Sequence, residues 1–168
     1  TPVLKRDRSL IRLIEIENPA SAFIFCNTKN TVHYVATVLQ RFGYDADEIS
    51  SDLNQQDRDR VLNRVRSGEL RFLVATDVAS RGLHVPDVSH VINYDLPQDC
   101  ADYVHRIGRT ARAGTSGDSI SFACETYAFS LPEIEAYIGH RIPTGVVGSE
   151  LFEGVKIPPW QPRKYPPA

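Results

Sequence analysis

The sequence of 168 residues contains no methionine, one tryptophan and three cysteines, and it lacks any long hydrophobic run. No apolar stretch approaches the roughly 20 residues of a membrane-spanning helix, and the first residues do not resemble a signal peptide. Cys26, Cys100 and Cys124 are odd in number and far apart, which excludes a disulfide framework or a cysteine zinc site. We therefore expect buried thiols, a cytoplasmic location and no membrane partner.

An excess of positive charge is also absent. The chain has 19 lysines and arginines against 21 acidic residues, for a net charge of −2. Any binding of phosphate groups must therefore depend on a local cluster of basic residues. The apolar share of 42% and the charged share of 24% are typical of a globular protein. The lack of methionine and the start at Thr1 lead us to expect a segment of a longer protein.

One such basic cluster exists, because Arg106, Arg109 and Arg112 lie within seven residues that include no acid. Their spacing of three would place the guanidinium groups on one side of a helical turn. A guanidinium group is always charged, and its planar donors suit phosphate oxygens. The same segment holds small residues, which let a ligand come close: Gly108, Ala111, Ala113 and Gly114. A phosphate site accounts for this composition better than the alternative, a solvated basic face.

Short apolar runs alternate with helical patterns along the chain, which predicts an α/β fold with a mainly parallel sheet covered on both faces. The expected strands are residues 22–26, 45–49, 72–76, 88–94 and 119–124, and the expected helices are residues 5–17, 29–42, 55–67, 99–108 and 131–139. From residue 141 onward prolines become frequent. We therefore divide the chain into a domain of residues 1–140 and a proline-rich tail of residues 141–168.

Ligands of a parallel sheet bind beyond the carboxyl ends of its strands. The segments expected at that edge are residues 27–30, residues 76–82 and the loop before the arginine cluster, and all are rich in hydroxyl groups or cations. Thr28 or Asn27 can cap the helix that follows it, and Asn54 can cap the helix that carries Arg58. A phosphate there would meet helix N–H groups as well as basic side chains.

Four segments appear in a characteristic order: residues 22–28 (AFIFCNT), 54–58 (NQQDR), 74–83 (VATDVASRGL) and 105–114 (HRIGRTARAG). They resemble motifs IV, IVa, V and VI in the second RecA-like domain of the DEAD-box ATP-dependent RNA helicases. The resemblance covers about residues 10–140 and implies a RecA-like three-layer sandwich. Residues 81–84 (RGLH) and 127–140 further resemble the RhlB branch of the bacterial members.

The chain has neither a G-x-x-x-x-G-K-[ST] loop nor an Asp-Glu-Ala-Asp sequence, which cradle phosphates and hold magnesium in this family. These elements belong to the family's first RecA-like domain. The resemblance therefore implies that this chain completes an ATP site shared with an N-terminal domain of the same protein. Mg²⁺ would be bound by that other domain, no metal ligand is expected here, and the chain alone should not hydrolyse ATP.

The resemblance assigns Arg109 and Arg112 to the γ-phosphate as arginine fingers, which stabilise charge during phosphoryl transfer. His105 and Arg106 would organise the cleft by contacting the other domain, or serve the fold only. Asp77 would fix Arg109 or a backbone turn, or only cap the short helix after it.

Two further residues of the expected nucleotide site are Gly82 and His84. His84 stands where most of the family has an aspartate that accepts a hydrogen bond from the ribose. A histidine can still form a hydrogen bond but offers no carboxylate.

For RNA, the resemblance implicates six residues: Thr28, Lys29, Gln55, Arg58, Thr76 and Gly82. Contacts to sugar and phosphate position a strand without reading its bases, so we expect binding independent of sequence. The alternative for Arg58 is an ordinary ion pair on the helix surface.

The tail carries Lys156, Arg163 and Lys164 together with Trp160 and Tyr165. It could contact RNA, serve as a proline-rich docking segment or have no binding role. The RhlB resemblance also implies a partner, the scaffold of a degradosome endoribonuclease, docking near the last helix, and a role in mRNA degradation. Two hypotheses compete with this one. The chain could be a module that only recruits such a partner, or it could be half of a DNA helicase.

Overall fold

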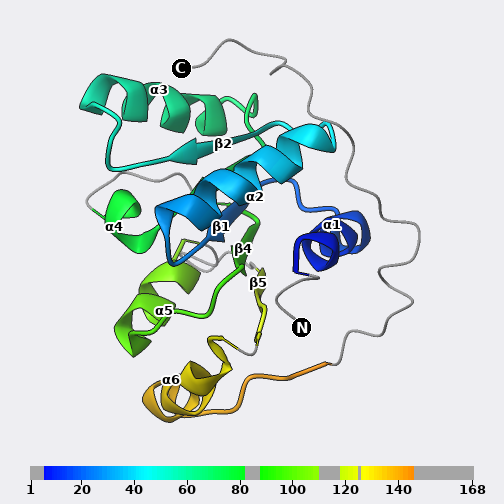
Figure 1. The fold of residues 1–168 in the computed structure, drawn as a ribbon, viewed down its shortest axis with the longest axis vertical. Coiled ribbons are helices and arrows are strands. Elements are labelled where there is room, and N and C mark those ends of the chain that lie inside the picture. The colour runs from blue at the N-terminus through cyan, green and yellow to red at the C-terminus, as the bar shows by residue number, and fades with distance from the viewer. Residues whose placement is uncertain (1–5, 82–87, 110–117, 125, 146–168) are drawn as a thin grey trace.

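The computed structural model describes residues 6–81, 88–109, 118–124 and 126–145, so the expected tail lies almost wholly outside the described residues. Five parallel strands form one sheet in the order β2-β3-β1-β4-β5 (Figure 1). They are β1 (Ala22–Phe25), β2 (Ala46–Ile49), β3 (Phe72–Ala75), β4 (His90–Asn93) and β5 (Asp118–Ser121). The predicted parallel α/β architecture is confirmed.

The five predicted helices are present, and their ends lie within about two residues of the expected ones. They are α1 (Arg6–Glu17), α2 (Lys29–Arg41), α3 (Gln55–Arg66), α5 (Cys100–Ile107) and α6 (Leu131–Ile138). Two shorter elements are α4 (Asp77–Ser80) and the 3₁₀ turn η2 (Ala128–Ser130). Among these described helices, none is both long and apolar enough to cross a membrane.

The two faces of the sheet bury separate apolar clusters, because successive side chains of a strand point to opposite faces. On β1, Ala22 and Ile24 pack with α1 and α2, whereas Phe23 and Phe25 pack with α3 and α4. All four residues of β1 are at most 1% exposed, as expected of the central strand. A third, smaller cluster joins α5 to α6 around Leu96, Tyr103 and Ile134.

One edge strand, β5, differs from the prediction, whereas the other, β2, matches it. We expected residues 119–124 to form a buried apolar strand, but β5 covers Asp118–Ser121, and its residues are exposed or half-buried. An edge strand has one neighbour, so less of its surface is covered and polar residues are tolerated.

Cys26 and Cys124 are buried free thiols as predicted, whereas Cys100 is partly exposed. Burial raises the pKa of the Cys26 thiol well above its ordinary value.

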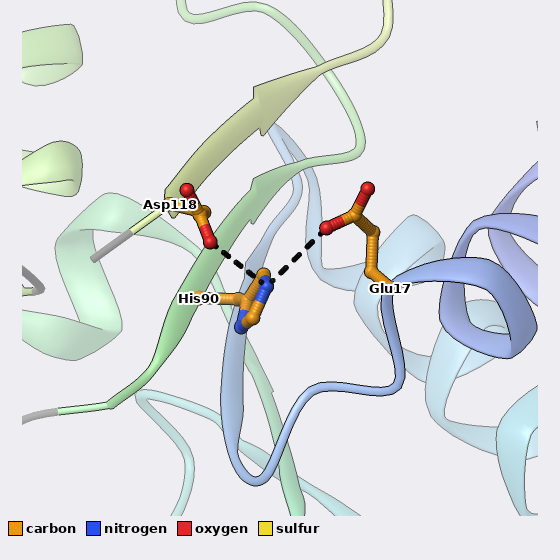
Figure 2. A group of neighbouring side chains, drawn as sticks. All are labelled: Glu17, His90 and Asp118. Atoms are coloured by element: carbon orange, nitrogen blue, oxygen red, sulfur yellow. Dashed lines mark ion pairs between the residues drawn. The ribbon is translucent and has the colours of Figure 1, made fainter. Parts of the chain in front are cut away.

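The two ends of the sheet carry different polar groups. At the amino ends of β4 and β5, Glu17, His90 and Asp118 face one another (Figure 2). At the carboxyl ends, each of four strands leads to the capped start of a helix, with Thr28, Asn54, Thr76 and Asp99 as the capping residues. The expected caps Thr28 and Asn54 are confirmed. This carboxyl edge holds most of the predicted site.

Candidate functional site

The centre of the site is a buried ion pair between Arg106 of α5 and Asp77 of α4. Nε and Nη2 of Arg106 donate to Oδ1 and Oδ2 of Asp77, each at 2.7 Å. This is the bidentate geometry that makes arginine–carboxylate pairs strong. The Arg106 side chain is 0% exposed and the Asp77 side chain 18% exposed. The pair therefore clamps the short helix α4 against α5.

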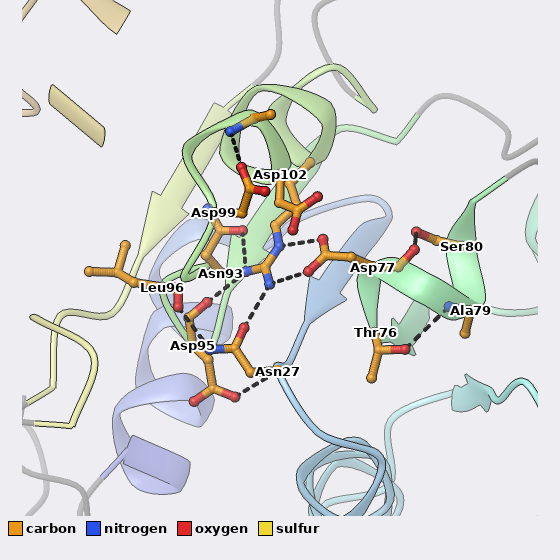
Figure 3. A network of polar contacts seen from close by, with 12 residues as sticks. Asn27, Thr76, Asp77, Ala79, Ser80, Asn93, Asp95, Leu96, Asp99 and Asp102 are labelled. Carbon is orange, nitrogen blue, oxygen red and sulfur yellow. Dashed lines mark hydrogen bonds and ion pairs between the residues drawn. The ribbon is translucent and has the colours of Figure 1, made fainter. Parts of the chain in front are cut away.

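The other donors of Arg106 are also satisfied, by acceptors that converge from two strand ends (Figure 3). Nη1 donates to the Asp95 carbonyl oxygen at 2.7 Å and to Asn93 Oδ1 at 3.4 Å, and Nη2 donates to Asn27 Oδ1 at 2.8 Å. All five N–H groups of the guanidinium are thus used within the chain. A buried charge is tolerated only when it is paired and hydrogen-bonded in this way.

Arg106 is 1% exposed, and its guanidinium donors are engaged within the chain. The purely structural alternative is the one that its burial supports. Asp77 does fix an arginine of the cluster, Arg106, but it is not the cap of α4. Thr76 caps that helix, because its Oγ1 accepts from the Ala79 N–H at 3.3 Å.

Asp95, which the sequence analysis missed, extends this network to the first described helix. Its Oδ2 accepts from the Asn27 N–H at 2.9 Å, and its Oδ1 forms an ion pair with Arg6 of α1. Arg6 also donates to the Tyr94 carbonyl oxygen at 3.0 Å. Burial lowers the pKa of Arg6, but the hydrogen bond and charge of Asp95 outweigh it and raise that pKa above its ordinary value. The position of Asp95 just beyond a buried strand was the available signal.

A hollow of about 250 Å³ lies against the buried pair. Its lining includes three of the predicted nucleotide-site residues besides Arg106, namely Asp77, His105 and Arg109, together with Phe25, Ser80, Arg81 and Asp102. Arg81 Nη2 donates to Asp102 Oδ1 at 3.1 Å, so each carboxylate of the hollow is paired with an arginine. Neither carboxylate would therefore strongly repel a phosphate. Gly82, His84 and Arg112 lie outside the described residues.

A second hollow, of about 270 Å³, brings together two of the predicted RNA-site residues, Lys29 and Thr76. Thr28 lies beside them, and its Oγ1 accepts from the Thr31 N–H at 3.2 Å to cap α2. Lys29 Nζ lies 3.2 Å from Asp52 Oδ1, and both side chains are more than half exposed. Such an exposed pair is weak, so an incoming phosphate can compete for the lysine.

Gln55 and Arg58 lie on α3, where Asn54 Oδ1 accepts from the Asp57 N–H at 2.8 Å. Gln55 Nε2 donates to Asp59 Oδ1 at 3.0 Å. Arg58 Nη2 donates to the Ser51 carbonyl oxygen at 3.4 Å, rather than pairing with a carboxylate on the helix. Its Nε is buried without a hydrogen-bond partner in the described part of the chain. The Nη groups of Arg58 make one long hydrogen bond among the described residues, so they retain capacity for an anion.

The profile described as the helicase conserved C-terminal domain matches residues 5–114. The ATP-dependent RNA helicase RhlB of Shewanella sp. (strain W3-18-1) is 52% identical over 160 residues, which is 95% of this chain and 36% of that protein. RhlB of Shewanella denitrificans is 50% identical over 95% of this chain and 37% of its own length. The chain thus spans about a third of the length of these relatives.

Two solved structures match over nearly their whole length. The Escherichia coli DEAD-box protein SrmB, solved bound to regulator of ribonuclease activity A, has a TM-score of 0.82 and 33% identity over 94% of this chain and 93% of that one. The C-terminal domain of the DEAD-box protein Dbp5 has a TM-score of 0.77 and 35% identity over 84% and 85%. The expected RecA-like fold is confirmed. The chain belongs to the helicase C-terminal domains of the DEAD-box proteins.

Proposed function

We propose that this chain is the second half of an ATP-dependent RNA helicase, which completes an ATP site with an upstream RecA-like domain and binds the RNA backbone. The observation that carries the proposal is the Arg106–Asp77 pair at the carboxyl edge of the sheet. This pair fixes the C-terminal end of α5. His105 at that end and Arg109 just beyond it both line the hollow against the pair. Relatives named ATP-dependent RNA helicases support this assignment.

The proposed role of Arg109 and Arg112 is to stabilise the charge on the transferring phosphoryl group. Arg109 follows the C-cap Gly108, and its N–H donates to the Arg106 carbonyl oxygen at 3.1 Å. Because every N–H group of the Arg106 guanidinium is hydrogen-bonded within the chain, Arg106 is held in place. The backbone that leads from Arg106 to Arg109 is therefore anchored at Arg106. ATP is the expected cofactor. Mg²⁺ would be held by the upstream domain, and His84 and Gly82 would lie near the nucleotide.

The proposed RNA surface lies at the starts of α2, α3 and α4, beside the hollow that Arg109 lines. Lys29 and Thr76 would contact the strand from the second hollow, Thr28 from the start of α2, and Gln55 and Arg58 from α3. Gly82 completes the proposed set. Helix N-termini present N–H groups that favour phosphate. A structure of Dbp5 bound to RNA and ADP BeF3, with a TM-score of 0.75 and 35% identity over 85% of this chain, supports both ligands.

The decisive experiment joins this chain to its upstream half and measures ATP hydrolysis with and without RNA. We expect Arg109→Ala and Arg112→Ala each to reduce RNA-stimulated hydrolysis by about 10³-fold, the range of an arginine finger. Arg8→Ala, which changes an exposed arginine of α1, is the matched control and should leave the rate unchanged. Equal rates in all four proteins would refute the proposed role, as would hydrolysis by the chain alone.

A second function, recruitment of a protein partner, is favoured by two exposed aromatic residues near the end of the domain. Phe129 of η2 is 63% exposed and Tyr137 of α6 is 61% exposed. The relative SrmB has been solved bound to a protein, the regulator of ribonuclease activity A. The partner that we propose is the scaffold of a degradosome endoribonuclease, which would place the protein in cytoplasmic mRNA degradation.

Binding of purified scaffold to the chain tests this second function. The double variant Phe129→Ala, Tyr137→Ala should lose binding, whereas Arg109→Ala should keep it. Binding that survives the aromatic substitutions but fails without residues 146–168 would move the proposed contact to the tail. Binding unaffected by either change would exclude recruitment through this end of the chain.

A further inference from the structure

Three side chains with metal-binding atoms meet at the amino ends of β4 and β5, and none of them lines the hollow beside Arg106. Glu17 ends α1, His90 begins β4 and Asp118 begins β5 (Figure 2). His90 Nε2 lies 3.4 Å from Asp118 Oδ2 and 3.7 Å from Glu17 Oε2. All three ligand atoms lie within 4.8 Å of one another.

The orientation of His90 is set by its neighbour Ser89. The Ser89 hydroxyl donates its single hydrogen to the Ser21 carbonyl oxygen at 2.6 Å. Its contact of 2.9 Å with His90 Nδ1 must therefore be one in which Ser89 accepts and Nδ1–H donates. In the neutral imidazole this leaves the lone pair on Nε2, and Nε2 is the atom that faces both carboxylates. His90 is 9% exposed, so it has little access to water.

This arrangement brings three electron-rich atoms together, which a cation would stabilise. Among the described residues, no lysine or arginine forms an ion pair with Glu17 or Asp118. A proton on Nε2 or a metal ion among the three atoms could fill this role, and the spacing of the three atoms favours the metal ion.

The spacing fits a tetrahedral ion. Metal–ligand bonds of about 2.0–2.2 Å place neighbouring ligand atoms about 3.3–3.6 Å apart. The observed separations of 3.4 and 3.7 Å are close to that range. We propose that Glu17, His90 and Asp118 bind a divalent transition-metal ion, with Zn²⁺ as the best fit. An imidazole with two carboxylates suits Zn²⁺, whereas Mg²⁺ and Ca²⁺ prefer oxygen ligands alone.

Such an ion would act as a structural clip. It would join the end of α1 to the first residues of β4 and β5, which lie 73 and 101 positions further along the chain (90 − 17 and 118 − 17). The hydrogen bond from His90 Nδ1 to Ser89 would orient the ligand, as in many zinc sites. None of the three residues lines the hollow that Arg109 lines or belongs to the proposed RNA surface, so the proposed metal site does not depend on the helicase function.

Calorimetric titration of the 168-residue chain with Zn²⁺ tests the proposal. We expect one site per chain, and Glu17→Gln, His90→Gln and Asp118→Asn should each weaken binding at least tenfold. Ser89→Ala should weaken it by about 10- to 100-fold, the usual effect of losing an outer-shell partner. His33→Gln is the matched control. His33 Nδ1 faces one carboxylate, that of Glu48 at 3.1 Å, and should not matter.

A Co²⁺ spectrum distinguishes this site from the three cysteines, because a site of nitrogen and oxygen ligands lacks the thiolate charge-transfer band. Circular dichroism verifies that each variant is folded. The side chains of Glu17 and Asp118 are 39% and 69% exposed, so their amide variants should not disturb packing. Absence of Zn²⁺ binding by the parent chain, or equal binding by the Glu17 and Asp118 variants, would overturn the proposal.

Discussion

Arg106 and Asp77, on different helices, hold each other through two parallel hydrogen bonds of 2.7 Å at the carboxyl edge of the sheet. This one contact joins two of the sequence motifs that define the family resemblance, residues 74–83 and 105–114. It also shows which arginine of the cluster forms a buried ion pair within the chain. Arg106 holds the fold, and Arg109, three positions further on, lines the hollow beside it.

The first prediction concerns this pair. Asp77→Asn leaves the Arg106 charge buried without its counter-charge, and removal of one partner of a buried pair costs about 3–5 kcal/mol. We expect a loss of that size in the free energy of unfolding, measured with urea. Asp57→Asn removes the carboxylate of a more exposed pair with Arg60 at 3.5 Å and should cost less than about 1 kcal/mol. Equal losses would contradict the special role of the buried pair.

The second prediction concerns the start of α3. Asn54→Ala removes the cap that accepts from the Asp57 N–H, which should lower the free energy of unfolding by about 1 kcal/mol. Asn54→Asp keeps an acceptor at the same position and should restore most of that loss. Gln56→Ala, an exposed change in the same helix, is the control. If Asn54→Ala had no effect on urea unfolding, the cap would not contribute to stability.

The third prediction concerns RNA. Each phosphate contact that is removed should reduce the slope of log affinity against log salt by about 0.7 for a single strand. We expect Lys29→Gln and Arg58→Gln to do this in the protein joined to its upstream half, for strands of any base sequence. Arg60→Gln, on the same helix as Arg58, should not change the slope. An unchanged slope in the first two variants would remove these residues from the proposed RNA surface.

The fourth prediction concerns pH. Tyr34 donates to Asp7 Oδ2 at 2.7 Å, and burial together with that bond raises the pKa of Tyr34 from 10.0 to about 12. Because the folded state keeps the proton longer, this contribution to stability is complete below pH 10 and is lost as the pH rises to about 12. The stability difference between the parent chain and Tyr34→Phe should therefore shrink over this range. A difference that stays constant would contradict the assignment.

Part of the fold follows from local sequence. The apolar run of residues 22–25 is a buried central strand, and helical spacing in α2 and α3 places their apolar residues against the sheet. The caps Thr28 and Asn54 each accept from a residue three positions later. Interactions of this range depend on neighbouring residues, so they can be read before the fold is known. The edge strand β5 could not, because its exposure depends on having one neighbour.

By itself, then, the sequence determined the parallel α/β class, the helix starts and the motifs that the family shares. The tertiary structure alone decided which charges meet. The strand order β2-β3-β1-β4-β5 places the ends of β1, β3 and β4 side by side, so Asn27, Asp77 and Asp95 converge on Arg106. The same order brings Glu17, His90 and Asp118 together at the other end. Charges so distant in sequence pair only after the chain crossovers have set their positions, and the burial of Arg106 then makes its pairing obligatory.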